Sequence, residues 1–183
     1  MNTNAVKREK YCTYEDWLAI DDGNRYELLN GELYMMSAPA TQHQAILMEI
    51  SRQLANFLLD KPCNVYPAPF GVHLNKDTVF QPDIVVVCDP DKINEKGCEG
   101  APDFVVEILS PSTASYDCIV KYKEYLHAGV KEYWIVDPTN KTVFVNFLKG
   151  SEYVLKTYSD ANNIPVNVLP ELAIDMKLAF KGL

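Results

Sequence analysis

The stretch "QPDIVVV", residues 81–87, decides the fold, because an apolar run bounded by a proline is typical of a buried strand. The run places a carboxylate, Asp83, at its head. Side chains alternate along a strand, so Gln81, Asp83, Val85 and Val87 share one face. Two interpretations of Asp83 are open: a turn residue at the strand entry, or a ligand of a metal ion.

A second apolar run, "PDFVVEILSP" at residues 102–111, also indicates a buried strand, with Val105, Glu107 and Leu109 on one face. A buried carboxylate is costly unless it has a partner, a proton or a metal ion. If the two strands are neighbours, Asp83 and Glu107 can meet at one point. There Mg²⁺, which prefers oxygen ligands, would offset both negative charges.

The stretch "SYDCIVKYKEYLHAG", residues 115–129, predicts a helix that Gly129 ends. Asp117, Lys121 and Tyr125 follow one another at intervals of four residues and so share a face of this helix. A cation at that place would stabilise charge that develops on a phosphate, or help to activate water. The alternative is a solvated lysine that pairs with Asp117.

The remaining pattern predicts an α/β (α+β) fold in which helices flank one central mixed β-sheet, with an N-terminal and a C-terminal β-hairpin. We expect one domain, residues 1–183, in which residues 1–12 are a loose segment. The expected elements are a helix at 13–20, a hairpin turning at Asn30-Gly31, an amphipathic helix at 41–59, an extended edge segment at 64–74, a surface loop at 89–101, a strand at 131–138 and a hairpin at 142–159 that turns near Gly150-Ser151.

Composition limits the classes of function. The net charge of −8 argues against a broad nucleic-acid surface, although a local basic cleft and a metal ion could still serve a phosphate site. The five cysteines form no CxxC pair and predict reduced, incidental thiols, and the scattered histidines argue against zinc. No apolar stretch of about 18 residues and no signal-like segment is present, so we expect a soluble cytoplasmic protein with no membrane partner.

Four stretches together, "YELLNGELYMMS", "QPDIVVV", "VVEILSPST" and "KYKEYLHAGVKEYWIVDP", resemble the PD-(D/E)XK restriction-endonuclease-like superfamily. Within it they are similar to a family of small endonuclease-like proteins once labelled a domain of unknown function. The resemblance covers residues 26–138. It implies a restriction-endonuclease-like core, a four-stranded mixed sheet flanked by helices, and Mg²⁺-dependent hydrolysis of phosphodiester bonds in DNA, with Mn²⁺ as a substitute.

The resemblance assigns the two metal-binding acids to Asp83 and Glu107, and a further metal ligand to the backbone carbonyl of Ile108. The superfamily pattern has a lysine two residues after the second acid, where this chain has Leu109. In related families the following helix supplies that lysine, and Lys121 fits this arrangement.

The resemblance also implies a third acid from an earlier element. Glu27 matches it, against the alternative of an exposed hairpin residue, and Glu49 is a rival on the long helix. Gln81 is expected beside the site as an accessory residue that bonds a phosphate or orients water. For His43, at the start of the long helix, a capping or surface position is favoured over a role in the site.

Three functions compete at this point: a metal-dependent DNA endonuclease, a catalytically silent binding or assembly module that keeps the nuclease fold, and a hydrolase of smaller phosphate esters. Cleavage of both strands of a duplex usually needs two sites related by a two-fold axis, so a homodimer is expected. The apolar stretch at residues 165–180 would either form that interface or complete the core.

Overall fold

The computed structural model describes residues 11–110, 114–159 and 163–182. Most of the expected loose segment, residues 1–10, therefore lies outside the described residues. Cys12, which follows, is buried, and its backbone N–H donates a hydrogen bond to the carbonyl of Gly31 at 2.8 Å. In the described part of the chain, no helix is long and apolar enough to cross a membrane.

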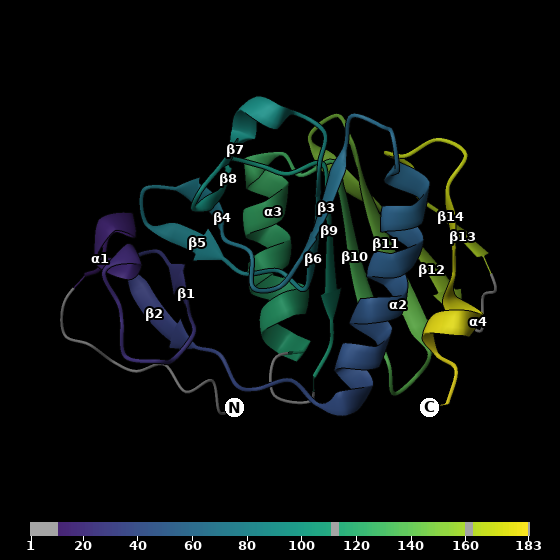
Figure 1. Ribbon diagram of the computed structural model, residues 1–183, viewed down its shortest axis with the longest axis horizontal. Coiled ribbons are helices and arrows are strands. Elements are labelled where there is room, and N and C mark those ends of the chain that lie inside the picture. The colour runs from purple at the N-terminus through teal and green to yellow at the C-terminus, as the bar shows by residue number, and fades with distance from the viewer. Residues whose placement is uncertain (1–10, 111–113, 160–162, 183) are drawn as a thin grey trace.

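Two six-stranded sheets are present in the described residues, and the one with the longer strands, here called the larger sheet, forms the centre of the molecule (Figure 1). Its strand order is β12-β11-β10-β9-β6-β3; β9 and β10 run parallel, and the other neighbours are antiparallel. The proline-containing segment supplies the edge strand β3, as expected. The bounds are β3 Asn64–Pro67, β6 Ile84–Val87, β9 Phe104–Ile108, β10 Glu132–Asp137, β11 Thr142–Lys149 and β12 Glu152–Ser159.

A second six-stranded sheet lies beside the first, so the expectation of a single central sheet is wrong. Its order is β2-β1-β5-β4-β8-β7, and β7 and β8 come from the segment expected to be only a surface loop. The Asn30-Gly31 hairpin is confirmed as β1–β2. The bounds are β1 Tyr26–Leu29, β2 Glu32–Met35, β4 Val72–Asn75, β5 Thr78–Phe80, β7 Ile93–Asn94 and β8 Gly97–Glu99.

Helices α2 (Thr41–Leu58) and α3 (Tyr122–Ala128) cover opposite faces of the larger sheet (Figure 1). The predicted amphipathic helix is α2, whose apolar residues pack on the face that carries Phe104, Val106 and Trp134. The other face, with Val105 and Tyr133, packs against α3 and the smaller sheet. The helices are α1 Tyr14–Leu18, α2 Thr41–Leu58, α3 Tyr122–Ala128 and α4 Met176–Ala179, with a 3₁₀ turn at Pro90–Lys92 and a π-helical turn at Tyr116–Lys121.

Local sequence signals fix several element ends. Thr13 caps α1 and forms a reciprocal capping box with Asp16. Gly129 ends α3 with φ +86°, a left-handed conformation that glycine adopts without a Cβ clash. The C-terminal hairpin β11–β12 turns at Gly150-Ser151, as expected, since Lys149 pairs with Glu152.

The C-terminal apolar segment completes the core. A short hairpin, β13 Asn163–Pro165 with β14 Ala173–Asp175, leads into α4. Side chains from residues 165–180, including Ile174 and Met176 at 0% exposure, pack in one hydrophobic core with side chains of α2 and of the larger sheet. Of the two expectations for residues 165–180, the structure supports the one in which this stretch finishes the domain's own core.

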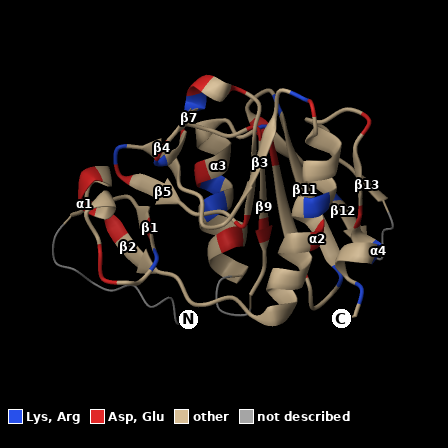
Figure 2. Cartoon of the chain, viewed as in Figure 1, with Lys and Arg blue, Asp and Glu red and all other residues tan. Residues whose placement is uncertain are grey.

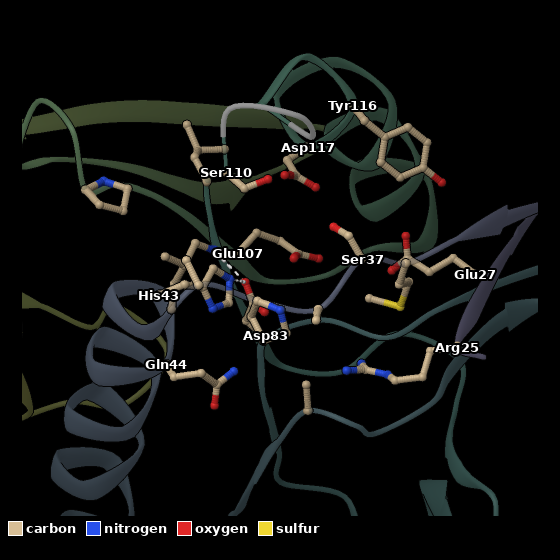
Figure 3. Close-up of a pocket in the computed structure, with 18 of the residues that line it drawn as sticks. Arg25, Glu27, Ser37, His43, Gln44, Asp83, Glu107, Ser110, Tyr116 and Asp117 are labelled. Atoms are coloured by element: carbon tan, nitrogen blue, oxygen red, sulfur yellow. Dashed lines mark hydrogen bonds and ion pairs between the residues drawn. The ribbon is translucent and has the colours of Figure 1, made fainter. Parts of the chain in front are cut away.

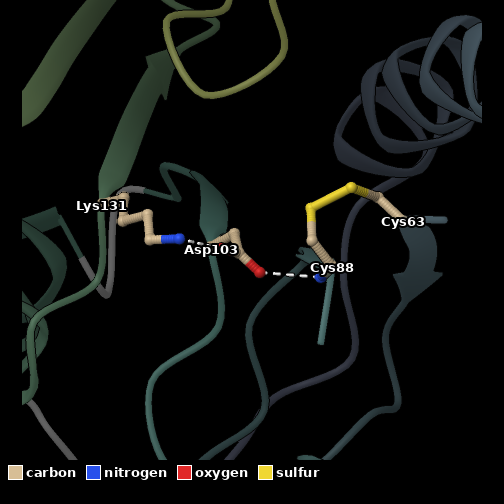
Figure 4. The surroundings of a disulfide bond; sticks show 4 residues. All are labelled: Cys63, Cys88, Asp103 and Lys131. Carbon is tan, nitrogen blue, oxygen red and sulfur yellow. Dashed lines mark hydrogen bonds and ion pairs between the residues drawn. A yellow bond between two sulfur atoms is a disulfide. The ribbon is translucent and has the colours of Figure 1, made fainter. Parts of the chain in front are cut away.

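A disulfide joins Cys63 and Cys88, so the expectation that every thiol is reduced is wrong for this pair (Figure 4). The antiparallel pairing of β3 and β6, in which Asn64 faces Val87, brings the two cysteines opposite each other one step further out. Asp103 links β6 to Lys131 at this end of the sheet, because its carboxylate accepts a hydrogen bond from the Cys88 N–H and pairs with Lys131 (Figure 4).

Candidate active site

The pairing of two strands explains why Asp83 and Glu107 are neighbours. In the antiparallel β6–β9 pair, Ile84 faces Val106. One further step along this register places Asp83, the residue before β6, opposite Glu107, which is 24 positions away in sequence. The alternation inferred from the sequence also holds, because Val105 and Leu109 pack in one cluster while Phe104, Val106 and Ile108 pack in another.

Both carboxylates line a pocket of about 480 Å³ between the two sheets and the start of α2 (Figure 3). The expected site residues Glu27, Ile108 and Lys121 line it as well. The connection from β2 to α2 forms one wall, and the loop after β10 forms another. The further lining residues used below are Arg25, His43 and Asp117.

Asp83 is held by two donors at the mouth of β6. Its Oδ2 accepts a hydrogen bond from the backbone N–H of Ile108 at 2.7 Å and lies 3.1 Å from Nε2 of His43. Its side chain is 15% exposed, so the carboxylate is still reachable from the pocket. The interpretation of Asp83 as only a turn residue fails to account for these contacts, because a turn would not require a carboxylate aimed at the neighbouring strand.

Lys121 lies among three buried carboxylates. Its Nζ is 2.8 Å from Glu107 Oε1, 2.9 Å from Glu27 Oε1 and 3.6 Å from Asp117 Oδ1. The Tyr125 hydroxyl donates a hydrogen bond to the same oxygen of Glu107. The predicted common face of the helix is therefore confirmed, and the interpretation of Lys121 as a solvated lysine is wrong. The π-helical turn that contains Asp117 and Lys121 was not predicted; such turns are often found at functional sites.

Burial and charge shift the pKa values of this cluster. Desolvation raises the pKa of Glu107 well above its ordinary value; the charges of Asp117, Asp83 and Glu27 add to that rise, while Lys121 opposes it. For Lys121, burial lowers the pKa, but the carboxylates of Glu107, Glu27 and Asp117 outweigh burial and raise it well above its ordinary value. Lys121 is therefore charged at any physiological pH, and Glu107 has excess negative charge around it.

The charge of the pocket favours an additional cation. Four carboxyl groups line it, Glu27, Asp83, Glu107 and Asp117, and they outnumber the two permanent cations, Arg25 and Lys121. Oxygen donors of this kind fit Mg²⁺ and Mn²⁺, and a divalent ion would neutralise that excess. Within the described residues, no three His, Cys, Asp or Glu side chains converge closely enough to hold an ion by themselves. A site formed by Asp83, Glu107 and the Ile108 carbonyl would use two side chains and one backbone oxygen.

His43 belongs to the pocket, so the preference for a capping or surface position is wrong. It comes from the first turn of α2, its side chain is 13% exposed, and its Nδ1 is buried without a partner among the described residues. Burial lowers its pKa, but the hydrogen bond and charge of Asp83 outweigh burial and raise it above the ordinary value. The contact with Asp83 therefore stabilises the protonated form of His43 relative to a free imidazole.

The two rival third acids are clearly separated by the structure. Glu27, on β1, is 4% exposed and contacts Lys121, so its interpretation as an exposed hairpin residue is wrong. Glu49, on α2, pairs with Arg52 and does not line the pocket.

Gln81 lies behind the pocket wall and does not line it. Its backbone N–H donates to Glu27 Oε1, its Oε1 accepts from the Arg25 Nε, and its Nε2 donates to the carbonyl of Tyr26. Its side chain is therefore committed to protein groups, and no local sequence pattern indicates that Arg25 is its partner.

The fold is that of a nuclease-like protein of known structure. It is similar to the crystal structure of a putative nuclease belonging to DUF820 from Anabaena variabilis ATCC 29413, with a TM-score of 0.77 and 22% sequence identity. The similarity covers 92% of this chain and 97% of that one.

The chain belongs to the Uma2 family, described as "Putative restriction endonuclease", whose model matches residues 9–177. It is also 28% identical over 134 residues to the uncharacterized protein slr1290 of Synechocystis sp. (strain PCC 6803), a match that covers 72% of this chain and 68% of that protein. The family expected from the sequence motifs is thereby confirmed.

Proposed function

We propose that this protein is a Mg²⁺-dependent endonuclease that hydrolyses phosphodiester bonds in DNA, with Mn²⁺ as a substitute. The observation that carries the proposal is the β6–β9 register, which brings Asp83 and Glu107 to the same end of two adjacent strands inside an acidic pocket. The family and the shared fold support a nuclease. The excess of carboxylates supports a divalent cation.

Asp83, Glu107 and the carbonyl of Ile108 would hold the ion. Such an ion polarises the phosphate and lowers the pKa of the attacking water. Asp83 is already fixed by the Ile108 N–H and by His43, so its carboxylate is preorganised. Burial and the neighbouring carboxylates raise the pKa of Glu107, and a cation bound beside it would act in the opposite direction and favour the carboxylate.

Lys121 opposes the rise in the pKa of Glu107, and it would orient the attacking water or stabilise charge that develops on the phosphate. It stands in place of the strand lysine that Leu109 replaces. Its three carboxylate contacts fix the ammonium group within the pocket, and Glu27 and Asp117 share in holding it there. Glu27 acts in this account as the third acid, and Gln81 acts through Glu27 and Arg25 rather than on the phosphate.

A single domain over residues 1–183 and a homodimer complete the proposal. Two copies related by a two-fold axis would present two such pockets to the two strands of a duplex. Because the C-terminal segment is used in the core, the dimer surface would have to lie elsewhere. Sedimentation velocity of the purified protein, with and without duplex DNA, would test for two chains per particle.

The proposed activity is tested with supercoiled plasmid. Wild-type protein should nick it with Mg²⁺ or Mn²⁺ and stop when a chelator is added. Asp83→Ala and Glu107→Ala should abolish nicking, and Glu27→Gln should reduce it. Glu49→Gln is the matched control, because Glu49 is the rival acid outside the pocket, and it should retain full activity.

Two results would overturn the proposal: equal nicking by wild type and both alanine variants, or no metal-dependent nicking at all. The second result, together with unaltered DNA binding, would favour the catalytically silent binding module instead.

A further inference from the structure

The pocket is lined by a second positively charged side chain, Arg25, most of whose hydrogen-bond donors have no partner among the described residues. Arg25 immediately precedes β1 and lines the pocket, and its guanidinium group points toward Asp83 across the pocket (Figure 3). Its Nε donates a hydrogen bond to Gln81 Oε1 at 3.0 Å. The neighbouring Nη2 is shielded from solvent and has no hydrogen-bond partner among the described residues. A buried donor of this kind is normally paired, and it points to a ligand.

Lys121 cannot take the role of an anion-binding residue in the same way. Its ammonium group has three N–H donors, and the carboxylates of Glu27, Glu107 and Asp117 surround it. The only other permanent cation that lines the pocket is Arg25, and the described residues place no carboxylate within ion-pair distance of it. A substrate phosphate that enters this acidic pocket therefore has one uncommitted side-chain cation available.

The surface of the protein makes a local cation more necessary. The chain carries a net charge of −8, and in Figure 2 the Lys and Arg residues lie apart from one another on several elements, α2 and α3 among them. A protein with an acidic net charge must draw its phosphate contacts from a few well-placed groups. Arginine suits this task, since its planar fork donates two parallel hydrogen bonds to a phosphate.

Hydrogen bonds hold both the backbone and the side chain of Arg25 in place. Its carbonyl accepts a hydrogen bond from the N–H of Met36, which ties it to the β2–α2 connection. Gln81 fixes the other end, because its side chain accepts from Arg25 while its backbone N–H donates to Glu27. Arg25 is thus linked through Gln81 to the same carboxylate that contacts Lys121.

We propose that Arg25 is the phosphate-binding residue of this pocket and contacts the non-bridging oxygens of a nucleic-acid phosphate, with Gln81 holding its guanidinium group. This inference rests on the proposed nuclease function and assigns that site its substrate contact. Nε would remain on Gln81, and the two Nη groups would donate to the phosphate.

The test measures DNA binding separately from metal binding. Wild type, Arg25→Met and Arg25→Lys are titrated against a fluorescently labelled duplex oligonucleotide by anisotropy, in Ca²⁺ and over a series of salt concentrations. Mg²⁺ binding is measured by calorimetry on the same preparations. Arg52→Met is the matched control, because Arg52 is an exposed arginine on α2 that pairs with Glu49 outside the pocket.

Arg25→Met should weaken DNA binding by about tenfold and make the slope of log affinity against log salt shallower by about 0.9. Arg25→Lys should keep the salt slope but recover only part of the affinity, because lysine lacks the fork. Arg52→Met should bind DNA as wild type does, and Mg²⁺ affinity should be unchanged in all variants.

Two failures are distinguishable. If wild type binds Mg²⁺ and nicks DNA while Arg25→Met and Arg25→Lys both bind DNA with wild-type affinity and salt slope, the assignment of Arg25 is wrong and the proposed function stands. If wild type binds neither Mg²⁺ nor DNA, the proposed function fails, and the Arg25 assignment fails with it.

Discussion

Two buried glutamates on adjacent parallel strands, Glu107 on β9 and Glu132 on β10, have opposite surroundings. Glu132 is 0% exposed and accepts hydrogen bonds from Trp134 Nε1, Asn167 Nδ2 and the backbone N–H of Val168. These donors are all uncharged, and they enclose the carboxylate on the α2 side of the sheet.

Glu107 faces a pocket and other charges. Its contacts are the Lys121 ammonium group and the Tyr125 hydroxyl, and three further carboxylates raise its pKa beyond the effect of burial. Burial alone would select both glutamates as candidates for function. The comparison shows that the neighbours decide: a carboxylate saturated by neutral donors is structural, whereas one crowded by like charges in an open pocket is available to a cation.

The largest expected effect is on the charge cluster around Glu107. Lys121→Met would leave three buried carboxylates without their common cation, and we expect a loss of about 3–5 kcal/mol in the free energy of unfolding. Urea denaturation measures it. Lys123→Met, which removes an exposed lysine in the first turn of α3, is the control and should change stability by less than about 0.5 kcal/mol. Equal stability of the two variants would contradict the claim that Lys121 stabilises the three buried carboxylates.

The next effect separates function from folding. Glu107→Gln keeps the shape of the side chain but removes a negative charge from a crowded site, so the melting temperature should stay the same or rise. Metal-dependent nicking should nonetheless fall by more than about 100-fold, because the variant loses a proposed metal ligand. If Glu107→Gln has a lower melting temperature than wild type and still nicks DNA, Glu107 is a structural residue and not a metal ligand.

Glu132 should show the opposite pattern. Glu132→Ala would leave three buried donors unpaired, and we expect a loss of about 2–3 kcal/mol in stability. Nicking per folded molecule should equal that of wild type. Glu152→Ala, which removes an exposed glutamate from β12, is the control for stability. Loss of nicking in a fully folded Glu132→Ala sample would show that Glu132 has a functional role, and would contradict its assignment as a structural residue.

The smallest effect is a pH dependence. Burial raises the pKa of Glu132, and its hydrogen bonds to Trp134, Val168 and Asn167 only partly offset that rise. A carboxyl group whose folded pKa is raised contributes stability that is present below its unfolded pKa and is lost as pH rises through the folded value. Wild type should therefore lose stability relative to Glu132→Gln as the pH rises above about 4.5, the ordinary pKa of a glutamate. Parallel stability curves for the two proteins would contradict the raised pKa.

Strand periodicity was sufficient to predict half of the site. The alternation in residues 81–87 and 102–111 put Asp83 and Glu107 on inward faces, and helical spacing put Lys121 on the face of Asp117 and Tyr125. The hairpins and the long helix followed from equally local signals, the turn at Asn30-Gly31 and the three-and-four repeat of α2. All of these are interactions within one element or between consecutive ones.

What could not be predicted depends on pairings between distant segments. His43 reaches Asp83 across 40 residues, and Arg25 reaches Gln81 across 56, through contacts that no local pattern encodes. The second sheet was missed because its strands have only two to four residues, too few to show alternation. The Cys63–Cys88 disulfide likewise depends on the β3–β6 register, which no local sequence pattern indicates.

The central claim, that the Glu107 pocket and not the Glu132 site binds a divalent cation, is tested most directly by calorimetric titration of Mg²⁺. Wild type, Glu107→Gln and Glu132→Gln are compared, each checked for folding by its circular dichroism spectrum. We predict saturable Mg²⁺ binding to wild type and to Glu132→Gln, and none to Glu107→Gln. Wild-type affinity in Glu107→Gln, or loss of binding in a folded Glu132→Gln alone, would contradict the account.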